Sequence, residues 1–427
     1  MMNRVVITGM GVCAPNGVGL EAFAAALEQG QSGIRFLSEL EELQFSCQIA
    51  GKPILEYINL NYYFTKVELK GLAANGLIYG MIAGMDAWWD AGNSRETQER
   101  PDEETGVVFG TGLLGIDKLR EAIYQVDAGN VKRLGSTAVA QTMASGISAY
   151  LGGKIGAGNW VSSNSSACST GTEALLMGYD HIKAGKATRM LVGSCSDSGP
   201  YIWGGFDAMR ILPRKYNDCP ESASRPMSAT ASGFVPGSGA GALVLESYAS
   251  AKARGARIYA EVLGGAVNSG GQRQGGSMTA PNSQAVQACI RKALKHAEVH
   301  PKEIDAINGH LTATSKDPVE IANWAAALER QGADFPHINS FKGHVGHCLA
   351  AAGSIESVGA VLQVHRQRLF GSLNCADLHP DIVNQVAATC IPQKTTAMSL
   401  DIVAKASFGF GDVNSCVIFK RYIEKNE

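Results

Sequence analysis

Short apolar runs that end at or beside a glycine recur along this chain of 427 residues. Four of them have the length and composition of buried strands: Val5 to Thr8, Gly106 to Phe109, Met190 to Val192 and Ala242 to Leu245. Between them lie longer stretches with apolar residues three or four apart, which predict helices over 72–91, 171–184, 283–297, 318–330 and 350–368. Strands that alternate with helices predict an α/β protein with mostly parallel sheets.

A charged segment broken by glycine, residues 252–257, divides the chain. After it, Ile258 to Leu263 begins the alternation of strands and helices again, as the first strand does near the N-terminus. We therefore predict two related α/β halves, residues 1–255 and 256–427.

Composition excludes several classes of partner. The net charge of −2 gives no basic field that would attract nucleic acid or anionic lipid. The chain has no apolar run of 18 residues, its first residues lack the longer apolar core and the small-residue cleavage site of a signal peptide, and its ten cysteines form no CxxC pair. We expect a cytoplasmic protein that binds neither membrane nor nucleic acid. Charged residues make up only 18%, against roughly 25% in an average soluble protein, which predicts a large subunit interface.

The segment Gly110 to Gly115 follows a predicted strand and matches the GxGxxG pattern of dinucleotide-binding folds. Such folds continue with a strand that carries a ribose-binding acid about 20 residues later. Here a helical stretch, 116–126, is followed by the polar turn 127–130 and no apolar strand. The pattern therefore predicts a tight turn, and we expect no cofactor.

Cys168 follows a run of small residues, 162–167, and opens a helix-forming stretch. A helix N-terminus offers free N–H groups and a partial positive charge, which lower the pKa of a thiol from about 8.5. The N–H of the cysteine itself can also stabilise an oxyanion. Cys168 is thus a candidate acyl-accepting nucleophile. A buried core cysteine is the alternative, because most cysteines are of that kind.

Two histidines lie in loops of the second half. His310 ends a short apolar run, and His347 follows two glycines at the start of an alanine-rich helix, where a neutral imidazole is favoured. A core or helix-capping histidine is the alternative for each. His344 and His347 have the spacing of metal ligands, but no acidic or thiolate cluster completes the set, so we predict no metal.

A glycine-aromatic loop, residues 406–414, lies near the C-terminus. Taken in order, Cys168, His310, His347 and this loop resemble the elongating β-ketoacyl-acyl-carrier-protein synthases of the thiolase superfamily. Further matching segments are 5–11, 224–226, 233–235, 239–246 and 251–261, so the resemblance covers essentially the whole chain. It implies a thiolase-like fold in which two similar α/β halves form αβαβα layers, and we predict a homodimer.

The resemblance also implies a role for each matching residue. Cys168 would accept the acyl group, while His310 and His347 promote malonyl decarboxylation with support from Lys342. The N–H of Phe410, the family's gating phenylalanine, would join that of Cys168 in an oxyanion hole. The remaining matches are Thr312 and Thr314 for the phosphopantetheine arm, Leu113 and Phe206 for the acyl pocket, and Lys132 and Arg133 for docking of the acyl carrier protein.

Two local differences from the family stand close to these residues. Leu311 replaces the glycine that follows the histidine, and the loop from His310 to Asp317 is one residue shorter than usual. Asp412 occupies a glycine position in the last loop that is expected to need φ > 0, a conformation that Asp tolerates better than most residues.

The predicted activity is decarboxylative condensation of an enzyme-bound acyl group with malonyl-acyl-carrier protein, in fatty acid or related polyketide or polyene synthesis. One alternative is a non-catalytic partner subunit that sets chain length, although such subunits usually lack the cysteine. Another is a thiolase or a CoA-dependent initiating enzyme, which uses one histidine and a second Cys or Asn differently. Acyl length and pathway stay open.

Overall fold

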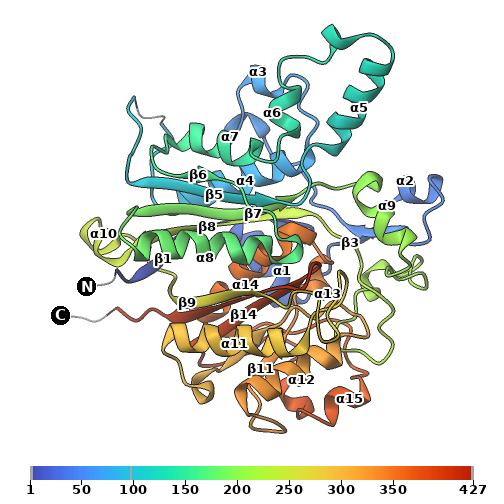
Figure 1. Ribbon diagram of the computed structural model, residues 1–427, viewed down its shortest axis with the longest axis vertical. Coiled ribbons are helices and arrows are strands. Elements are labelled where there is room, and N and C mark those ends of the chain that lie inside the picture. The colour runs from blue at the N-terminus through green and yellow to red at the C-terminus, as the bar shows by residue number, and fades with distance from the viewer. Residues whose placement is uncertain (1–2, 97–98, 425–427) are drawn as a thin grey trace.

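The computed structural model describes residues 3–96 and 99–424 and has five layers, which follow one another from top to bottom in Figure 1. Helices cover both outer faces, strands form the second and fourth layers, and a pair of helices lies in the middle. The outer helices are α4 (Asn75–Asp90) and α7 (Gly146–Ile155) on one side and α11 (Ser283–Ala297) and α12 (Asp317–Leu328) on the other, and the central pair is α8 (Thr170–Lys183) and α14 (Ala352–Arg366).

The strands follow one repeated order. They run β6-β5-β7-β8-β1 in the first half of the chain and β11-β10-β14-β15-β9 in the second, and β1 joins β9 through three residue pairs. The bounds are β1 (Val5–Ala14), β5 (Thr105–Thr111), β6 (Val161–Ser162), β7 (Arg189–Ser196), β8 (Gly239–Ser247), β9 (Ala260–Ser269), β10 (Ala306–Asn308), β11 (His337–Asn339), β14 (Ile402–Gly409) and β15 (Val413–Arg421). The repeated order explains the layered arrangement, and the division at residue 255 stays a prediction.

The prediction of mostly parallel sheets is wrong. β5 is parallel to β6 and β7, and β10 is parallel to β11 and β14, but β7–β8, β8–β1, β14–β15, β15–β9 and β1–β9 are antiparallel. Parallel pairing needs a crossover between consecutive strands. β14 and β15 are instead joined by the tight turn 410–412, which lies inside the segment that sequence reasoning treats as one loop.

The predicted strands and helices are present, with shifted ends. β1 continues beyond Thr8 because residues 9–13 still pair with β8, so its glycines lie within the strand. α14 starts two residues late because Leu349–Ala351 form a 3-10 turn, and it ends where Gln367 adopts φ 54°. In the GxGxxG segment, Gly110 and Thr111 end β5, the chain bends at 112–113, and Gly115 at φ 67° precedes helix α5 (Ile116–Asp127). Within residues 3–96 and 99–424, no helix is long and apolar enough to cross a membrane.

The two central helices touch at their N-terminal ends. A Cβ atom on Gly353 of α14 would lie 2.6 Å from the backbone nitrogen of Thr172 on α8, so only glycine permits this approach. The contact matters for the site because Cys168 immediately precedes α8 and His347 precedes α14. The crossing therefore brings the two halves of the sequence together at these residues.

Replacing Gly353 by alanine should destabilise the protein by about 1–3 kcal/mol, because the added methyl group forces the two helices apart. The measurement is the midpoint of thermal unfolding. Gly205→Ala is the matched control, since no atom lies within 4 Å of its Cβ position and residue 205 is exposed on a helix. That control should unfold at or slightly above the wild-type temperature. An unchanged midpoint for Gly353→Ala would contradict the close packing.

Candidate active site

Cys168 lies in a short 3-10 turn, Ala167–Ser169, that leads directly into α8. Ala167 takes a positive φ of 47°, which turns the chain sharply just before the cysteine. The end of β14 approaches the same turn, since a Cβ on Gly409 would lie 3.1 Å from the Cys168 nitrogen. The small residues on either side thus let the glycine-aromatic loop reach the cysteine.

The thiol does not have the lowered pKa that its position before a helix predicts. Burial raises the pKa of Cys168 to about 11, although the charge of Lys342 and the backbone N–H of Phe410 act in the opposite direction. Desolvation among apolar side chains outweighs the helix terminus here. The resting nucleophile is therefore a thiol, and acyl transfer requires a group that accepts its proton.

His310 follows β10 and is held through its backbone. The N–H groups of His310 and Leu311 donate to the two carboxylate oxygens of Glu320, each at 2.7 Å. Burial raises the pKa of Glu320, on the first turn of α12, to about 7. Leu311, which replaces the family's glycine, is buried in the core and keeps its backbone hydrogen bond. The substitution thus leaves the histidine anchored.

His347 lies between α13 (Lys342–Val345) and the 3-10 turn 349–351. The backbone N–H of Leu349 donates to its Nδ1 atom at 3.1 Å. A neutral imidazole carries one proton, so a ring that accepts at Nδ1 carries its proton on Nε2. This hydrogen bond therefore assigns the tautomer and makes Nε2 of His347 a donor toward the site.

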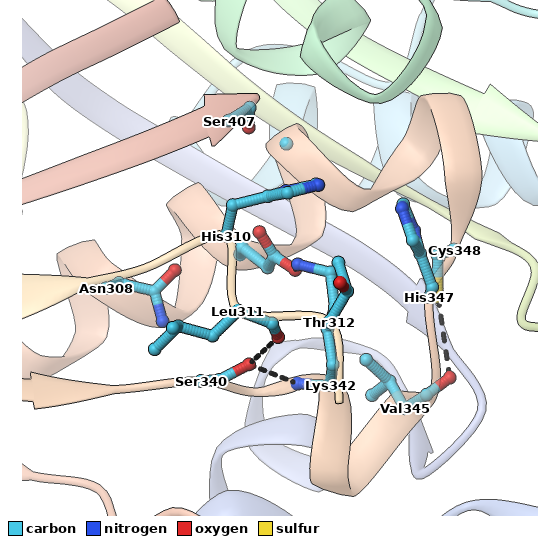
Figure 2. A network of polar contacts seen from close by, with 12 residues as sticks. Asn308, His310, Leu311, Thr312, Ser340, Lys342, Val345, His347, Cys348 and Ser407 are labelled. Carbon is cyan, nitrogen blue, oxygen red and sulfur yellow. Dashed lines mark hydrogen bonds and ion pairs between the residues drawn. The ribbon is translucent and has the colours of Figure 1, made fainter. Parts of the chain in front are cut away.

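The two histidines are neutral at ordinary pH. Burial, followed by the charge of Lys342, lowers the pKa of both rings well below the usual value, and Lys405 acts in the same direction. The ring centroids are 5.3 Å apart with an angle of 83° between the planes. Figure 2 shows the His310 side chain extending across the view toward the side on which the His347 ring stands. Two uncharged imidazoles, each with one nitrogen that donates and one that accepts a hydrogen bond, thus face one small volume.

Lys342 acts on the two histidines through its charge, from a buried position. It is fully buried, and its Nζ donates to Oε1 of Glu356 on α14 at 2.5 Å. The predicted support of the histidines by Lys342 is thus electrostatic in this structure, since its hydrogen-bonding partner is the carboxylate.

Two cavities meet at Cys168. The smaller, about 330 Å³, is lined by Leu113 and Phe206 as the resemblance implies, and the larger, about 550 Å³, by Thr312 and Thr314. The residues that line both cavities are Cys168, Phe234, His347 and Phe410. Phe410, whose ring lies 6.2 Å from that of Phe206, is therefore one of the four residues where the two cavities meet.

The shortened loop after His310 is closed by Asp317. Its carboxylate accepts the backbone N–H groups of Thr312 at 2.8 Å and Ala313 at 3.1 Å, and Ala313 adopts φ 62°. The hydroxyl oxygens of Thr312 and Thr314 lie 3.1 Å apart in the wall of the larger cavity. One residue fewer is thus accommodated by a tight turn, and the two threonines still face the cavity.

Lys132 and Arg133 are not brought to the site within one chain. They lie in a 3-10 turn between α5 and α6 (Ala138–Thr142). Figure 1 shows α5 and α6 at one end of the molecule and α11 and α12, which help to line the larger cavity, at the opposite end. A docking role for this basic pair stays a prediction.

The reactive atoms of Cys168, His310 and His347 all lie within 4.8 Å of one another, and these are donor types that metals also use. A metal would require the thiolate, which the raised pKa of Cys168 disfavours. His344 lies outside this cluster. It is fully buried, and burial lowers its pKa to about 4.

Sequence reasoning missed three charged residues that support the site: Glu320, Glu356 and Lys405. Lys405 left the clearest signal, because it stands between alanines in an apolar strand. Glu320 lies in the first turn of the helix that begins at Asp317, where acidic residues are common because they interact favourably with the helix dipole. Glu356 lies within a helix and offers no such mark.

Known proteins share this sequence and arrangement. Sequence profiles described as "Beta-ketoacyl synthase, N-terminal domain" and "Beta-ketoacyl synthase, C-terminal domain" match residues 2–251 and 259–376. The chain is 31% identical to 3-oxoacyl-[acyl-carrier-protein] synthase 1 of Escherichia coli K12, over 98% of this chain and 99% of that one.

Solved structures agree with this match. A β-ketoacyl synthase from Burkholderia phymatum is 28% identical, with a TM-score of 0.88 over 99% of this chain and 100% of that one. The second is a chain from the complex of a type II polyketide synthase acyl-carrier protein with its ketosynthase bound to the hexaketide. It is 27% identical, with a TM-score of 0.86 and coverage of 99% and 100%.

Alkylation of Cys168 should accelerate with pH well beyond the range of an ordinary cysteine. Because the pKa of Cys168 is about 11, the thiolate fraction rises about tenfold per pH unit up to pH 10. The measurement is the rate of iodoacetamide labelling at residue 168, followed by peptide mass spectrometry between pH 6 and 10. A rate that reaches its plateau below pH 8 would contradict the effect of burial.

Proposed function

The chain belongs to the β-ketoacyl synthase family, and we propose that Cys168, His310 and His347 carry out its decarboxylative condensation. Like its relatives, the protein is an acyltransferase that joins an acyl group to a two-carbon unit from a malonyl thioester and yields a 3-oxoacyl thioester. The observation that supports these roles is the convergence of the three reactive groups where the two cavities meet. One cavity can hold the acyl chain while the other admits the arm of the malonyl donor.

Acyl transfer to Cys168 comes first in this proposal. The thiol attacks the carbonyl carbon of the incoming thioester while His310, whose Nδ1 has no hydrogen-bond partner among the described residues, accepts its proton only until the departing thiolate takes it. The negative oxygen is stabilised by the backbone N–H groups of Cys168 and Phe410, of which the latter is directed at the thiol. The carbon–sulfur bond to the carrier then breaks, and the departing thiolate takes the proton from His310.

Decarboxylation and condensation follow. The thioester carbonyl of the malonyl group accepts hydrogen bonds from His347, through Nε2, and from His310. The bond to the carboxylate breaks, CO₂ leaves, and the electron pair forms an enolate that these neutral donors stabilise. The enolate carbon attacks the acyl carbon on Cys168, the carbon–sulfur bond breaks, and the thiolate takes a proton from solvent. The products are CO₂ and the 3-oxoacyl thioester.

The substrates divide between the cavities in the same proposal. The acyl chain occupies the smaller cavity beside Leu113 and Phe206, and the phosphopantetheine arm occupies the larger one, where Thr312 and Thr314 offer hydroxyl groups. Phe410 is the gate between them, since it lines both.

A homodimer and a basic docking site complete the proposal. Several apolar side chains on and after α5 are exposed in a single chain: Leu119, Ile123, Tyr124, Val126, Val131 and Val139. A second copy would cover them. Lys132 and Arg133 adjoin this face, and the proposal places the docking of an acidic carrier at this basic pair. A cytoplasmic location is supported by the ten cysteines, all of which are free thiols.

Condensation should fail when Cys168 is replaced by alanine. Wild-type protein with acyl-carrier and malonyl-carrier substrates is expected to release CO₂ and 3-oxoacyl product, followed by mass spectrometry. Cys168→Ala should lower product formation at least about 10³-fold, because no acyl-enzyme forms, while the histidines still support malonyl decarboxylation. Cys219→Ala is the matched control: this thiol is also partly exposed but lines neither cavity, and its rate should stay at the wild-type level.

Two outcomes would contradict the proposal. Condensation by Cys168→Ala at the wild-type rate would exclude the cysteine as nucleophile. A wild-type protein that makes no product, but enables a separate synthase to do so, would favour the non-catalytic partner subunit. Comparing CoA-bound with carrier-bound substrates in the same assay separates the condensing enzyme from a CoA-dependent initiating one.

A further inference from the structure

Lys405 is a fully buried lysine in the middle of β14 that the reaction described above does not use. Its Nζ donates to Oε2 of Glu356 at 2.8 Å and to the hydroxyl of Ser407 at 2.9 Å. A third bond goes to the backbone carbonyl of Ala406. Lysine is almost never fully buried unless it is paired, and here all three donor hydrogens have partners. The residue is therefore held in one place.

The ammonium group belongs to a buried cluster of four charged residues. Lys342 donates to one carboxylate oxygen of Glu356, and Lys405 donates to the other. Glu320, which anchors the backbone at His310, is the second acid whose field acts on Lys405. Two ammonium ions thus stand against the Glu356 carboxylate and against Glu320, whose pKa is about 7, so removing Lys405 would change the charge balance near the histidines.

Lys405 is also connected to the oxyanion donors by a short chain of hydrogen bonds. Ser407 shares a hydrogen bond of 2.9 Å with the hydroxyl of Thr172 on α8. Ser169, the residue after Cys168, donates to the backbone carbonyl of Ser407 at 3.1 Å. Phe410 follows Ser407 by three residues on the same strand and turn. Ser407, labelled in Figure 2, is therefore where the strand of Phe410 is fastened to the helix of Cys168.

We propose that Lys405 is a positioning residue for the condensation: its ammonium ion fastens Ser407 to Glu356 and places a fixed positive charge beside the two histidines. The first effect keeps the N–H groups of Cys168 and Phe410 aimed at one point. The second adds to burial and to the charge of Lys342 in keeping both imidazoles unprotonated. Lys405 touches no substrate, because it lines neither cavity. The inference rests on the proposed function of Cys168 and the histidines.

The sign of the pH effect follows from the charges around the rings. Lys342 and Lys405 both lower the pKa of His310 and of His347, and His347 acts on His310 in the same direction. Glu356 and Glu320 face the ammonium groups, and the Cys168 thiol is uncharged at neutral pH. Removing the charge of Lys405 therefore raises the pKa of both rings. Activity should then decline at a higher pH on the acid side.

The experiment compares Lys405→Met with wild type in malonyl decarboxylation and in condensation between pH 5.5 and 8.5. We expect kcat to fall about 10- to 100-fold at pH 7.5, with KM changed less than about threefold, because donors are misplaced while the cavities stay intact. The acid limb, which is the decline of kcat on the acid side of the pH profile, should move to higher pH. Lys118→Met is the matched control, since Lys118 is also a buried lysine paired with a glutamate, on α5 and outside both cavities.

A second variant separates position from charge. Ser407→Ala removes the hydroxyl link but keeps the ammonium ion, so kcat should fall while the acid limb stays at its wild-type pH. A Lys405→Met protein with the kcat and the acid limb of the wild type would overturn the inference. If Lys405→Met does not fold, a wild-type kcat in Ser407→Ala would overturn it instead. The wild-type rate tests the proposed function, and the ratio of variant to wild-type rate tests the role of Lys405.

Discussion

Protonating either imidazole of the site would place a positive charge in a desolvated space beside two lysine ammonium ions. The free energy that this would cost keeps both rings neutral, and the proposed reaction depends on neutral rings. A neutral imidazole can present an N–H donor at the place where the enolate forms. The tautomer is settled at His347 by the backbone N–H of Leu349. The same desolvation raises the pKa of Cys168, so one environment determines the protonation of all three reactive groups. Acid–base behaviour here is a property of the pocket as a whole.

The fold delivers these groups from distant parts of the sequence to one place. Cys168 precedes α8 and His347 precedes α14, and the two helices form the central layer and touch at Gly353. His310 comes from the end of β10, and Phe410 from the turn between β14 and β15. The ends of β10 and β14 thus supply one component each, while Glu356 on α14 accepts hydrogen bonds from Lys342 of α13 and from Lys405 of β14.

Sequence reasoning identifies the residues proposed to contact the substrate better than the residues that hold those side chains in place. Cys168 and the histidines stand in small-residue loops whose pattern is distinctive, and their order resembles one family. The prediction of a lowered pKa for Cys168 is wrong. The helix terminus beside the thiol can be recognised in the sequence, whereas the apolar walls formed by Phe206 and Phe234 come from other parts of the chain. The parallel sheet was wrong because the hairpin turn 410–412 lies inside a glycine-aromatic segment. Glu320 and Glu356 act only through contacts made in the folded state.

The most direct test of the neutral histidine pair is nitrogen NMR of the protein labelled with ¹⁵N in its histidine rings, with His310→Gln and His347→Gln variants to assign the signals. Across pH 6 to 8, His347 should show one protonated and one bare nitrogen, the proton on Nε2, with no titration, and His310 should likewise stay neutral. A ring that titrates near pH 6.5, or a His347 that carries its proton on Nδ1, would contradict the account.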